Sequence, residues 1–441
     1  MNNNNNDTEG LNRREFTRRS SLLAGATLLG SAAAVSHAAG SDTLKVAVVG
    51  CGGRGTGAAR QALNADTGVE IVALADAFVD RAEKCASVMR RVGGNRASVP
   101  KDRIFVGFTA FRDAIDLADV VILATPPGFR PEHFEYAVSR GCHVFMEKPV
   151  ATDAFGVRRV LAAAKQARVQ KLNVVVGLQR HYQSCYLEAL ERYRAGAIGD
   201  IVAGQVYWNS SGVWVRPREE GQSEMVYQMR NWYYFNWLCG DHILEQHIHN
   251  IDVANWFLGE LPASAQGMGG REVRKGPDHG EIFDHHFVEF TYPSGAVISS
   301  QCRHQPGCAE MVEERFQATG GTLFTSGGND AVLTNRAGET LYKHRGLFDR
   351  SPYQIEHDTL FASIREGGHI DTADYGAQAT LTAIMGRMAT YTGKRITWDK
   401  ALNARQRLVP DANDLAWDSA PPTVPDARGI YAVPIPGKTR L

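Results

Sequence analysis

The sequence predicts an α/β protein in which a doubly wound parallel sheet is followed by an α/β region with a large, mostly antiparallel open sheet. Two observations predict this. In the first half, short apolar runs alternate with helical segments, which is the pattern of parallel strands joined by crossover helices. After about residue 180 the runs alternate apolar and polar residues instead, and turn residues separate them.

Apolar runs in the first half are rich in β-branched residues, as expected of strands buried on both faces. The first, Leu44–Val49, leads directly into the glycine-rich segment 50–55, and the second, residues 69–75, ends at Asp76. Further strands are predicted at residues 119–124, 143–146 and 173–177, and helices at 57–64, 80–92, 132–140 and 154–168. Right-handed crossovers between such strands produce a doubly wound sheet.

The second half predicts a mostly antiparallel sheet interrupted by helices. Strands are predicted at residues 200–209, 284–291, 296–303 and 314–325, with the hairpin-like turn Tyr-Pro-Ser-Gly at 292–295. Helices are predicted at residues 241–257, 357–366 and 378–392. The tail from about residue 405 is rich in Pro and Asp, and we expect an extended arm that lies on this subunit or on a neighbour.

The composition is that of an ordinary globular protein, since 44% of the 441 residues are hydrophobic and 22% are charged. The 48 Lys and Arg residues balance the 48 Asp and Glu residues, which gives no support for binding nucleic acid. This balance favours a neutral small molecule as partner. The seven cysteines include no Cys-x-x-Cys pair, so neither a disulfide framework nor a structural zinc site is indicated.

The N-terminal segment has the three parts of an export signal. Residues 12–17, Asn-Arg-Arg-Glu-Phe-Thr, carry a twin-arginine pattern, an apolar stretch covers residues 22–35, and Ser-His-Ala at 36–38 fits a cleavage site. The apolar stretch is too short to span a bilayer. We therefore expect residues 1–38 to be a twin-arginine signal peptide that directs the protein to the periplasm, with no stable membrane span. The alternative is a disordered basic tail before an Ala-rich helix.

Gly50, Gly52 and Gly55 form a Gly-x-Gly-x-x-Gly pattern between a predicted strand and a predicted helix. The first glycine permits a tight turn, the second lets the backbone approach a pyrophosphate, and the third lets helix and strand pack closely. The helix N-terminus offers free N–H donors and a positive dipole end to the phosphates. The pattern predicts a dinucleotide-binding loop that includes Gly53 and Arg54.

Asp76, at the end of the next predicted strand, distinguishes between the two nicotinamide cofactors. It lies about twenty residues beyond the loop, where an acidic side chain accepts hydrogen bonds from the ribose hydroxyls and repels a 2′-phosphate. We therefore predict NAD, with NADP less favoured. The alternative is a glycine turn and a helix-capping aspartate that bind no nucleotide.

Motifs at two further strand ends carry a family resemblance. Thr125-Pro126 and Glu147-Lys148-Pro149, together with segments 177–180, 240–259, 384–387 and 392–394, resemble the Gfo/Idh/MocA oxidoreductases over nearly all the mature chain. The resemblance implies an N-terminal Rossmann domain and a C-terminal α/β domain whose open sheet often forms the oligomer interface, hence a homodimer or homotetramer. With it, the predicted cofactor-binding residues are Gly50, Gly52, Gly53, Arg54, Gly55, Asp76, Arg81, Thr125, Pro126, Glu147, Lys148 and Arg180.

Lys148 resembles the family's catalytic lysine, near the substrate hydroxyl and the nicotinamide. Its expected partners Glu245, His249 and Asp252 are spaced i, i+4 and i+7, which places them on one face of a helix. The family commonly has Asp in place of Glu245 and His in place of Arg130. Alcohol oxidation needs a base for the proton and a partner for the developing alkoxide. We predict His249 as general base, because a near-neutral pKa suits proton transfer, with Lys148 and Glu245 completing the catalytic set.

Substrate contacts are predicted on segments that flank these residues. Most of the aromatic cluster Trp208, Trp214, Trp232, Tyr233, Tyr234, Phe235 and Trp237 is expected to pack in the core, with one or two rings forming a stacking wall for a sugar. No metal is predicted, although His242, Glu245 and His249 would also suit zinc. The predicted substrate-binding residues are Gln179, Tyr182, Trp237 and Asp252.

Together these patterns predict an exported NAD-dependent oxidoreductase acting on a secondary alcohol of a sugar, glycoside or cyclitol. Because no dinucleotide pool exists outside the cytoplasm, we expect the cofactor to be tightly held and recycled in place. Two alternatives stay open: a redox-neutral NAD-dependent glycoside hydrolase, which oxidises, eliminates, adds water and reduces again, and a non-catalytic cofactor-bound binding protein. The predicted division is a signal peptide at 1–38, a Rossmann domain at 43–180, a substrate and oligomerisation domain at 181–404 and an arm at 405–441.

Overall fold

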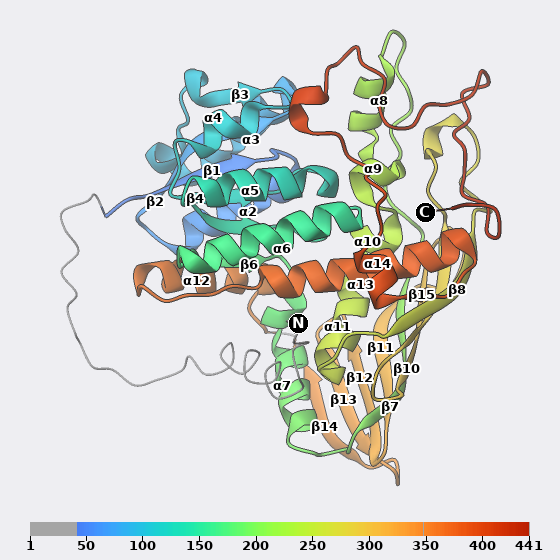
Figure 1. Ribbon diagram of the computed structural model, residues 1–441. Coiled ribbons are helices and arrows are strands. Elements are labelled where there is room, and N and C mark those ends of the chain that lie inside the picture. Colours follow the sequence, from blue (N-terminus) through green and yellow to red (C-terminus); the bar gives the residue numbers. More distant parts are fainter. Residues whose placement is uncertain (1–41, 347, 441) are drawn as a thin grey trace, which may run out of the picture.

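The computed structural model describes residues 42–346 and 348–440, and the predicted signal peptide lies outside these residues. Two sheets, each covered by helices, form the two layered halves of the molecule (Figure 1). Among the described helices, none combines the length and apolar character that crossing a membrane requires.

The first sheet has six parallel strands in the order β3-β2-β1-β4-β5-β6, which confirms the predicted doubly wound arrangement. The strand order reverses between β1 (Leu44–Val49) and β4 (Val120–Leu123), and in such sheets ligands bind at the carboxyl ends of the strands beside this reversal. The remaining elements are β2 (Val69–Asp76), β3 (Ile104–Val106), β5 (His143–Met146), β6 (Val174–Val176), α2 (Gly53–Ala65), α3 (Val79–Gly93), α4 (Ala110–Ile115), α5 (Arg130–Ser139) and α6 (Ala154–Val169).

The second sheet has nine strands in the order β14-β13-β12-β11-β7-β10-β9-β8-β15. Strands β7 (Ile201–Ser210) and β10 (Val297–His304) pair in parallel, whereas the other neighbours pair antiparallel, as predicted for most of this sheet. The predicted hairpin turn is present, with Gly295 N donating to Tyr292 O. The other strands are β8 (Ser264–Gly270), β9 (His285–Thr291), β11 (Met311–Ala318), β12 (Gly321–Ser326), β13 (Asp330–Asn335), β14 (Thr340–Arg345) and β15 (Ile396–Thr397).

Two elements predicted in the second half are divided in the structure. The single strand predicted over residues 314–325 is wrong, because Thr319 and Gly320 turn the chain and Glu314 pairs across a hairpin with Thr325. The single helix predicted over residues 241–257 is also wrong. It is interrupted between α10 (His242–Glu245) and α11 (Ile248–Leu258), where His247 N bonds to the carbonyl of His242, five residues earlier, and widens the turn.

Two late helices pack on the first half, and α13 also joins it to the second. Helix α13 (Ala373–Thr392) packs on α6 of the first half and on β8 and β9 of the second (Figure 1), and nearly all of its length is buried. Helix α12 (Pro352–Arg365) packs against α2, directly behind the glycine-rich loop. The remaining helices are α7 (Ser184–Arg194), α8 (Glu224–Arg230), α9 (Asn236–Cys239) and α14 (Trp398–Leu402).

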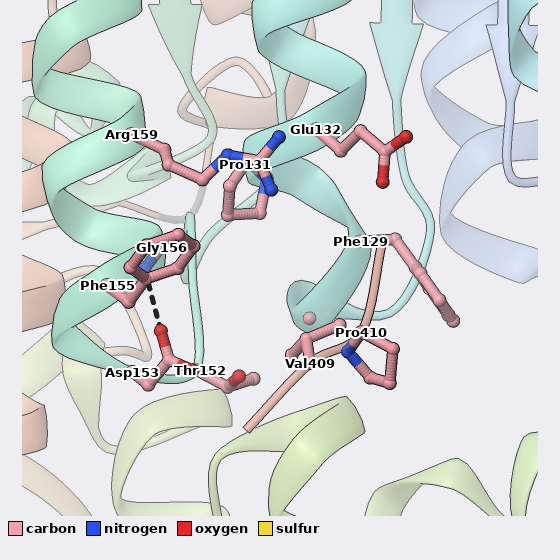
Figure 2. A pocket seen from close by; sticks show the side chains of 11 residues that line it. Phe129, Pro131, Glu132, Thr152, Asp153, Phe155, Gly156, Arg159, Val409 and Pro410 are labelled. Atoms are coloured by element: carbon pink, nitrogen blue, oxygen red, sulfur yellow. Dashed lines mark hydrogen bonds between the residues drawn. The ribbon is translucent and has the colours of Figure 1, made fainter. Parts of the chain in front are cut away.

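The C-terminal arm runs from residue 405 across the outside of both halves of its own chain (Figure 1). Leu408 N donates to Asp153 Oδ2 at 2.6 Å and Ala412 N donates to Glu132 Oε2 at 2.8 Å. Figure 2 shows Val409 and Pro410 of the arm closing a small hollow beside the N-terminus of α6, which Asp153 caps through the backbone N–H of Gly156. None of the predicted site residues lines this hollow.

Candidate active site

The glycine loop between β1 and α2 is shaped by close backbone contacts on one side and open space on the other. Gly50 has a φ of +97°, and a Cβ on Gly55 would lie only 1.8 Å from the carbonyl oxygen of Gly50. A Cβ on Gly52 or Gly53 would meet no atom within 4 Å, and no side chain caps the N-terminus of α2. The loop therefore leaves a free space in front of uncapped backbone N–H groups, which fits a pyrophosphate.

Asp76 stands at the end of β2 beside this loop. Its carboxylate accepts the backbone N–H of Cys51 at 2.7 Å and of Phe78 at 2.9 Å, and burial raises the pKa of Asp76 above its ordinary value. A hollow open to solvent lies against Asp76, so a nucleoside whose pyrophosphate is held by the loop can lie beside this carboxylate. The residues present therefore fit a dinucleotide. The lining residues are Val49, Ala75, Asp76, Ala77, Gly107, Phe108, Ala110, Phe111, Thr125, Phe129 and His133.

Three other predicted cofactor residues lie on the segments that follow β2 and β4, and one of them lines the same hollow. Thr125 lines it, and its hydroxyl is 3.2 Å from His133 Nδ1. Pro126 follows at the start of a short turn that leads into α5. Arg81 lies on the first turn of α3, where its charge opposes the upward shift of the pKa of Asp76.

Arg54 in the loop is held by two carboxylates from distant parts of the chain. Its guanidinium forms ion pairs with Glu147 at the end of β5 and, at 3.0 Å, with Glu356 on α12. Although burial opposes it, the charges of Arg54 and Lys148 hold the pKa of Glu147 below its ordinary value. Burial, together with the charge of Glu147, raises the pKa of Glu356 well above its ordinary value. Arg54 thus ties the loop to the end of β5 and to the late helix α12.

Lys148 and Glu245 form the centre of the second part of the site. Lys148 Nζ lies 3.5 Å from Glu245 Oε1 and donates at 2.5 Å to the backbone carbonyl of Glu245. Both side chains are largely buried, at 13% and 15% exposure. Burial raises the pKa of Glu245, although the charges of Lys148 and Arg130 oppose the shift. The pair predicted from the sequence is therefore in contact, with Lys148 from the first half and Glu245 from the second.

His249 lies on α11, one element beyond Glu245, with its ring stacked near Trp208 at a centroid distance of 6.0 Å. Burial first, and then the charge of Lys148, lowers the pKa of His249 well below its usual range. The ring is therefore neutral at physiological pH. Burial therefore makes the ring a weaker base than the free histidine on which its assignment as general base rested.

His181 is a site residue that the sequence analysis missed. Its Nε2 lies 2.9 Å from Asp252 Oδ2, and its ring stacks on Trp256 at 3.9 Å. The residue falls between Arg180 and Tyr182, both of which were predicted to contribute, so its position in the motif was the available signal. This contact orients Asp252, which was predicted to bind substrate.

Several buried polar atoms of this region have no hydrogen-bond partner. Buried polar groups are normally hydrogen-bonded, so these atoms are available to a ligand or to water. Tyr233 supplies one of these unpaired atoms, its hydroxyl oxygen. Burial and then the charge of Glu245 raise the pKa of its phenol well above the ordinary value. The atoms are Gln179 Oε1, His249 Nδ1, Asp252 Oδ1, Tyr233 Oη and Arg130 Nε.

Three predicted site residues are placed elsewhere. Arg180 forms a fully buried ion pair with Glu314, so its charge is neutralised inside the protein rather than offered to a cofactor. Tyr182 packs in the apolar core of the first sheet. Trp237 is only 1% exposed, and its Nε1 donates to Gln228 at 2.7 Å. These three side chains stabilise the framework, and Trp208 rather than Trp237 is the aromatic residue stacked beside His249.

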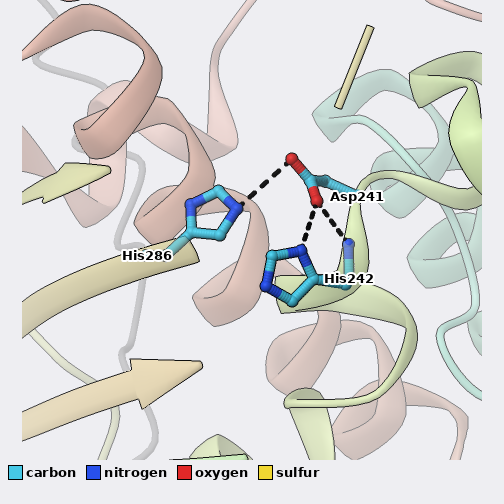
Figure 3. Close-up of side chains that lie close together, drawn as sticks. All are labelled: Asp241, His242 and His286. Carbon is cyan, nitrogen blue, oxygen red and sulfur yellow. Dashed lines mark hydrogen bonds and ion pairs between the residues drawn. The ribbon is translucent and has the colours of Figure 1, made fainter. Parts of the chain in front are cut away.

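Asp241, His242 and His286 form a buried cluster next to α10 (Figure 3). Among residues 42–346 and 348–440, these are the metal-binding types whose ligand atoms converge within 4.8 Å, a different set from the His242, Glu245 and His249 considered above. The Asp241 carboxylate accepts hydrogen bonds from His242 Nδ1 at 2.8 Å, Phe283 N at 3.0 Å and the Tyr391 hydroxyl at 2.5 Å. Because the same carboxylate also accepts the backbone N–H of His242 at 2.5 Å, Asp241 anchors the start of α10.

Comparison with known proteins gives a consistent family match. Residues 44–176 match the Gfo/Idh/MocA oxidoreductase family with an NAD-binding Rossmann fold, and residues 186–322 match the Gfo/Idh/MocA C-terminal domain. The two matches together cover more than half of the chain.

Curated relatives include Inositol 2-dehydrogenase 3 of Saccharopolyspora erythraea, 32% identical over 58% of this chain and 65% of its own length. The 2,7-anhydro-N-acetylneuraminate hydratase of Escherichia coli is 28% identical over 42% of this chain and 45% of its own length. The chain thus spans between about half and two thirds of these relatives. The Inositol 2-dehydrogenase of Streptomyces avermitilis aligns more fully, at 23% identity over 82% of this chain and 96% of its own length.

Solved structures share the fold. A levoglucosan dehydrogenase in complex with NADH and levoglucosan superposes with a TM-score of 0.65 at 18% identity, covering 81% of this chain and 99% of that chain. The aldose-aldose oxidoreductase of Caulobacter crescentus gives a TM-score of 0.62 at 18% identity, covering 80% of this chain and 99% of that one. At these identities the likeness establishes the architecture of both halves.

Proposed function

Because this chain belongs to the Gfo/Idh/MocA oxidoreductase family, we propose that it oxidises or reduces a secondary alcohol of a sugar, glycoside or cyclitol with NAD. The observation that carries the proposal is the contact between Lys148 and Glu245 at the strand end next to the dinucleotide loop. The names of relatives, which act on inositol and levoglucosan, support this substrate class.

The proton transfer can be assigned to side chains of this chain. When bound, NAD supplies the hydride chemistry. Lys148 donates a hydrogen bond to the reacting oxygen and stabilises its developing negative charge. Glu245 accepts the proton, because burial has raised its pKa towards the working pH and made it a stronger base than an exposed carboxylate. The neutral ring of His249 and the Asp252 carboxylate bind neighbouring hydroxyls through their unpaired atoms.

This assignment moves the general base from His249, the residue favoured by the sequence, to Glu245. The pH dependence of kcat/KM tests it. A base works only when it is deprotonated, so kcat/KM falls as the pH drops through the pKa of the base, which gives the acidic limb of the pH profile. Because the pKa of Glu245 is raised, this limb should lie at a higher pH than an exposed glutamate would give. We expect Glu245→Gln to abolish the acidic limb and His249→Asn to leave its position unchanged. Loss of the limb in His249→Asn would restore histidine as the base.

We further propose that the protein is exported by the twin-arginine route and retains its cofactor. The support is the ordered signal in residues 1–38 and the absence of an exchangeable dinucleotide pool outside the cytoplasm. Fractionation of the native host, with detection of the processed chain and its bound nucleotide in the periplasm, tests this. A cytoplasmic, unprocessed chain would contradict it.

A redox-neutral reaction is the second candidate. The Escherichia coli relative is named a hydratase, and addition of water causes no net oxidation. An NAD-dependent glycoside hydrolase, which oxidises, eliminates, adds water and reduces again, needs much the same acid and base residues. Retained cofactor suits this cycle because oxidation and reduction balance within one turnover. A cofactor-bound binding protein without turnover is the third possibility.

One assay separates the three. Purified protein, without added cofactor, is incubated with nitrophenyl glycosides, free sugars and cyclitols. An absorbance change of bound cofactor without cleavage supports the dehydrogenase, whereas release of the aglycone without net cofactor reduction supports the hydrolase. No response, with Lys148→Ala indistinguishable from the wild type, supports the binding protein.

We also propose a homodimer or homotetramer assembled through the nine-stranded sheet. The side chains of one face of this sheet, such as Val202 at 50% exposure, are open in the single chain. Light scattering coupled to size-exclusion chromatography measures the mass, and a monomer at micromolar concentration would contradict the proposal.

A further inference from the structure

The C-terminal arm reaches the rim of the hollow beside Asp76. Its Trp417 ring lies 5.0 Å from Phe78 and 4.5 Å from Phe108, measured between centroids. Phe108 lines the hollow, and Phe78 follows Asp76 by two residues, with its backbone N–H bonded to the Asp76 carboxylate. The indole therefore packs against one aromatic residue that lines this hollow and another that follows Asp76 in the chain.

The chain on each side of Trp417 is fastened to the rest of the protein. Before it, Asp411 pairs with Arg159 of α6 at 3.1 Å and Asn413 accepts a hydrogen bond from Arg112 of α4 at 3.0 Å. After it, Thr423 O accepts from Gln228 at 2.7 Å, and Tyr431 contacts Phe235 at 5.0 Å. The arm is thus a strap held at both ends.

Trp417 itself is attached to the second half of the protein. Its carbonyl accepts the hydroxyl of Ser223, the N-cap of α8, at 2.6 Å. On the same helix, Arg230 lies 3.7 Å over the ring of Phe78 and pairs with Asp80 of α3 at 2.7 Å. Three attachments from the second half therefore meet at the nucleoside end of the first half.

We propose that the arm forms one wall of the cofactor site and that Trp417 retains NAD by covering its adenosine end, an inference that rests on the proposed function. A flat indole next to two phenyl rings presents the stacking surface that an adenine base recognises. Because the strap is fastened on both sides, release of the nucleotide requires the indole to leave Phe78 and Phe108. NAD is then retained because it dissociates slowly, and the residues that slow its dissociation lie far from the reacting atoms.

The test measures release of NADH from the full chain, by the loss of NADH fluorescence after addition of excess NAD, together with the nucleotide content of the purified protein. We expect Trp417→Ala to raise the dissociation rate constant at least about tenfold, which corresponds to about 1.4 kcal/mol. Trp417→Phe, which keeps an aromatic ring, is expected to stay within about twofold of the wild type. Phe348→Ala removes an aromatic side chain that is 97% exposed and serves as the matched control.

The possible outcomes distinguish failure of the inference about the arm from failure of the proposed function. If the wild type binds NADH and Trp417→Ala releases it at the rate of Phe348→Ala, the arm plays no part in retention and the inference is overturned. If the wild type itself binds no NADH, the proposed function fails and the inference falls with it. Asp411→Asn, which loosens the strap without touching the rim, is expected to accelerate release as well, so that misfolding of one variant does not decide the result.

Discussion

The nucleotide-binding end of the site and the Lys148–Glu245 end are formed by different kinds of groups. At the nucleotide end, backbone N–H groups, glycines and one carboxylate leave a space that the chain itself keeps open. At the Lys148–Glu245 end, buried ionisable side chains carry unpaired atoms and shifted pKa values. The first end depends on the shape of a short stretch of chain, whereas the second depends on segments about a hundred residues apart being held at the correct distance. Substitutions at the two ends should therefore fail in different ways.

The largest effect is expected at the side-chain end. Lys148→Met removes the charge that stabilises the reacting oxygen and should lower kcat by about 10³-fold, the scale of a lost transition-state donor. Because Lys148 is not part of the loop, nucleotide content should stay at the wild-type value. Steady-state kinetics with extraction of bound nucleotide measures both. A variant that loses its nucleotide as well would remove the distinction between the two ends.

At the nucleotide-binding end, we expect substitutions that fill space in the glycine loop to weaken NADH binding. Gly52→Ala places a methyl group in free space, so the melting temperature should be unchanged while NADH affinity falls by about 100-fold, or about 2.7 kcal/mol. Gly55→Ala is the matched contrast, since its Cβ would overlap the Gly50 carbonyl, and it should lower the melting temperature. Equal stability of the two variants would show that the helix and strand can separate without cost.

A smaller effect is expected for cofactor choice. Asp76→Asn removes the charge that repels a 2′-phosphate and should shift the ratio of NAD to NADP affinity by about tenfold towards NADP. The amide still accepts one of the two backbone N–H bonds, so the fold should persist. Fluorescence titration with NADH and NADPH gives the ratio. An unchanged ratio would mean that another group selects the cofactor.

The smallest effect is expected from metal removal. Dialysis against EDTA should change neither kcat nor melting temperature, because the oxygens of Asp241 are already occupied by protein donors. Loss of activity that zinc restores would assign the cluster of Asp241, His242 and His286 to the catalytic end.

The same difference explains what the sequence could predict. Gly50, Asp76 and Lys148 lie at strand ends, and strand ends of a parallel sheet meet at one edge, so spacing along the chain was sufficient to bring them together. The partners of Arg54, Arg180 and His181 could not be found in this way. They are Glu356, Glu314 and Asp252, which are between 71 and 302 residues distant in the chain.

The break between α10 and α11 could not be predicted from the helical spacing of the residues either. Glu245, His249 and Asp252 have ideal helical spacing, but the bond from His247 N to the His242 carbonyl inserts a wider turn among them. The lowered pKa of His249 has a related cause, because residue type sets only its starting value. Burial and the charge of Lys148 set the rest, and both come from the assembled fold.

The joining of the two halves by the late helix α13 has a consequence for synthesis. Strand β6 at the edge of the first sheet is completed by residues 370–372, since Val174 N bonds to Ile370 O and Thr372 N bonds to Val174 O. At about 5–20 residues per second, a ribosome needs about 10–40 seconds to extend the nascent chain from residue 180 to the end of α13. During that interval the first half exposes an unfinished edge and the uncovered face of α6, so the part of the protein made first is the part that waits longest for its final packing.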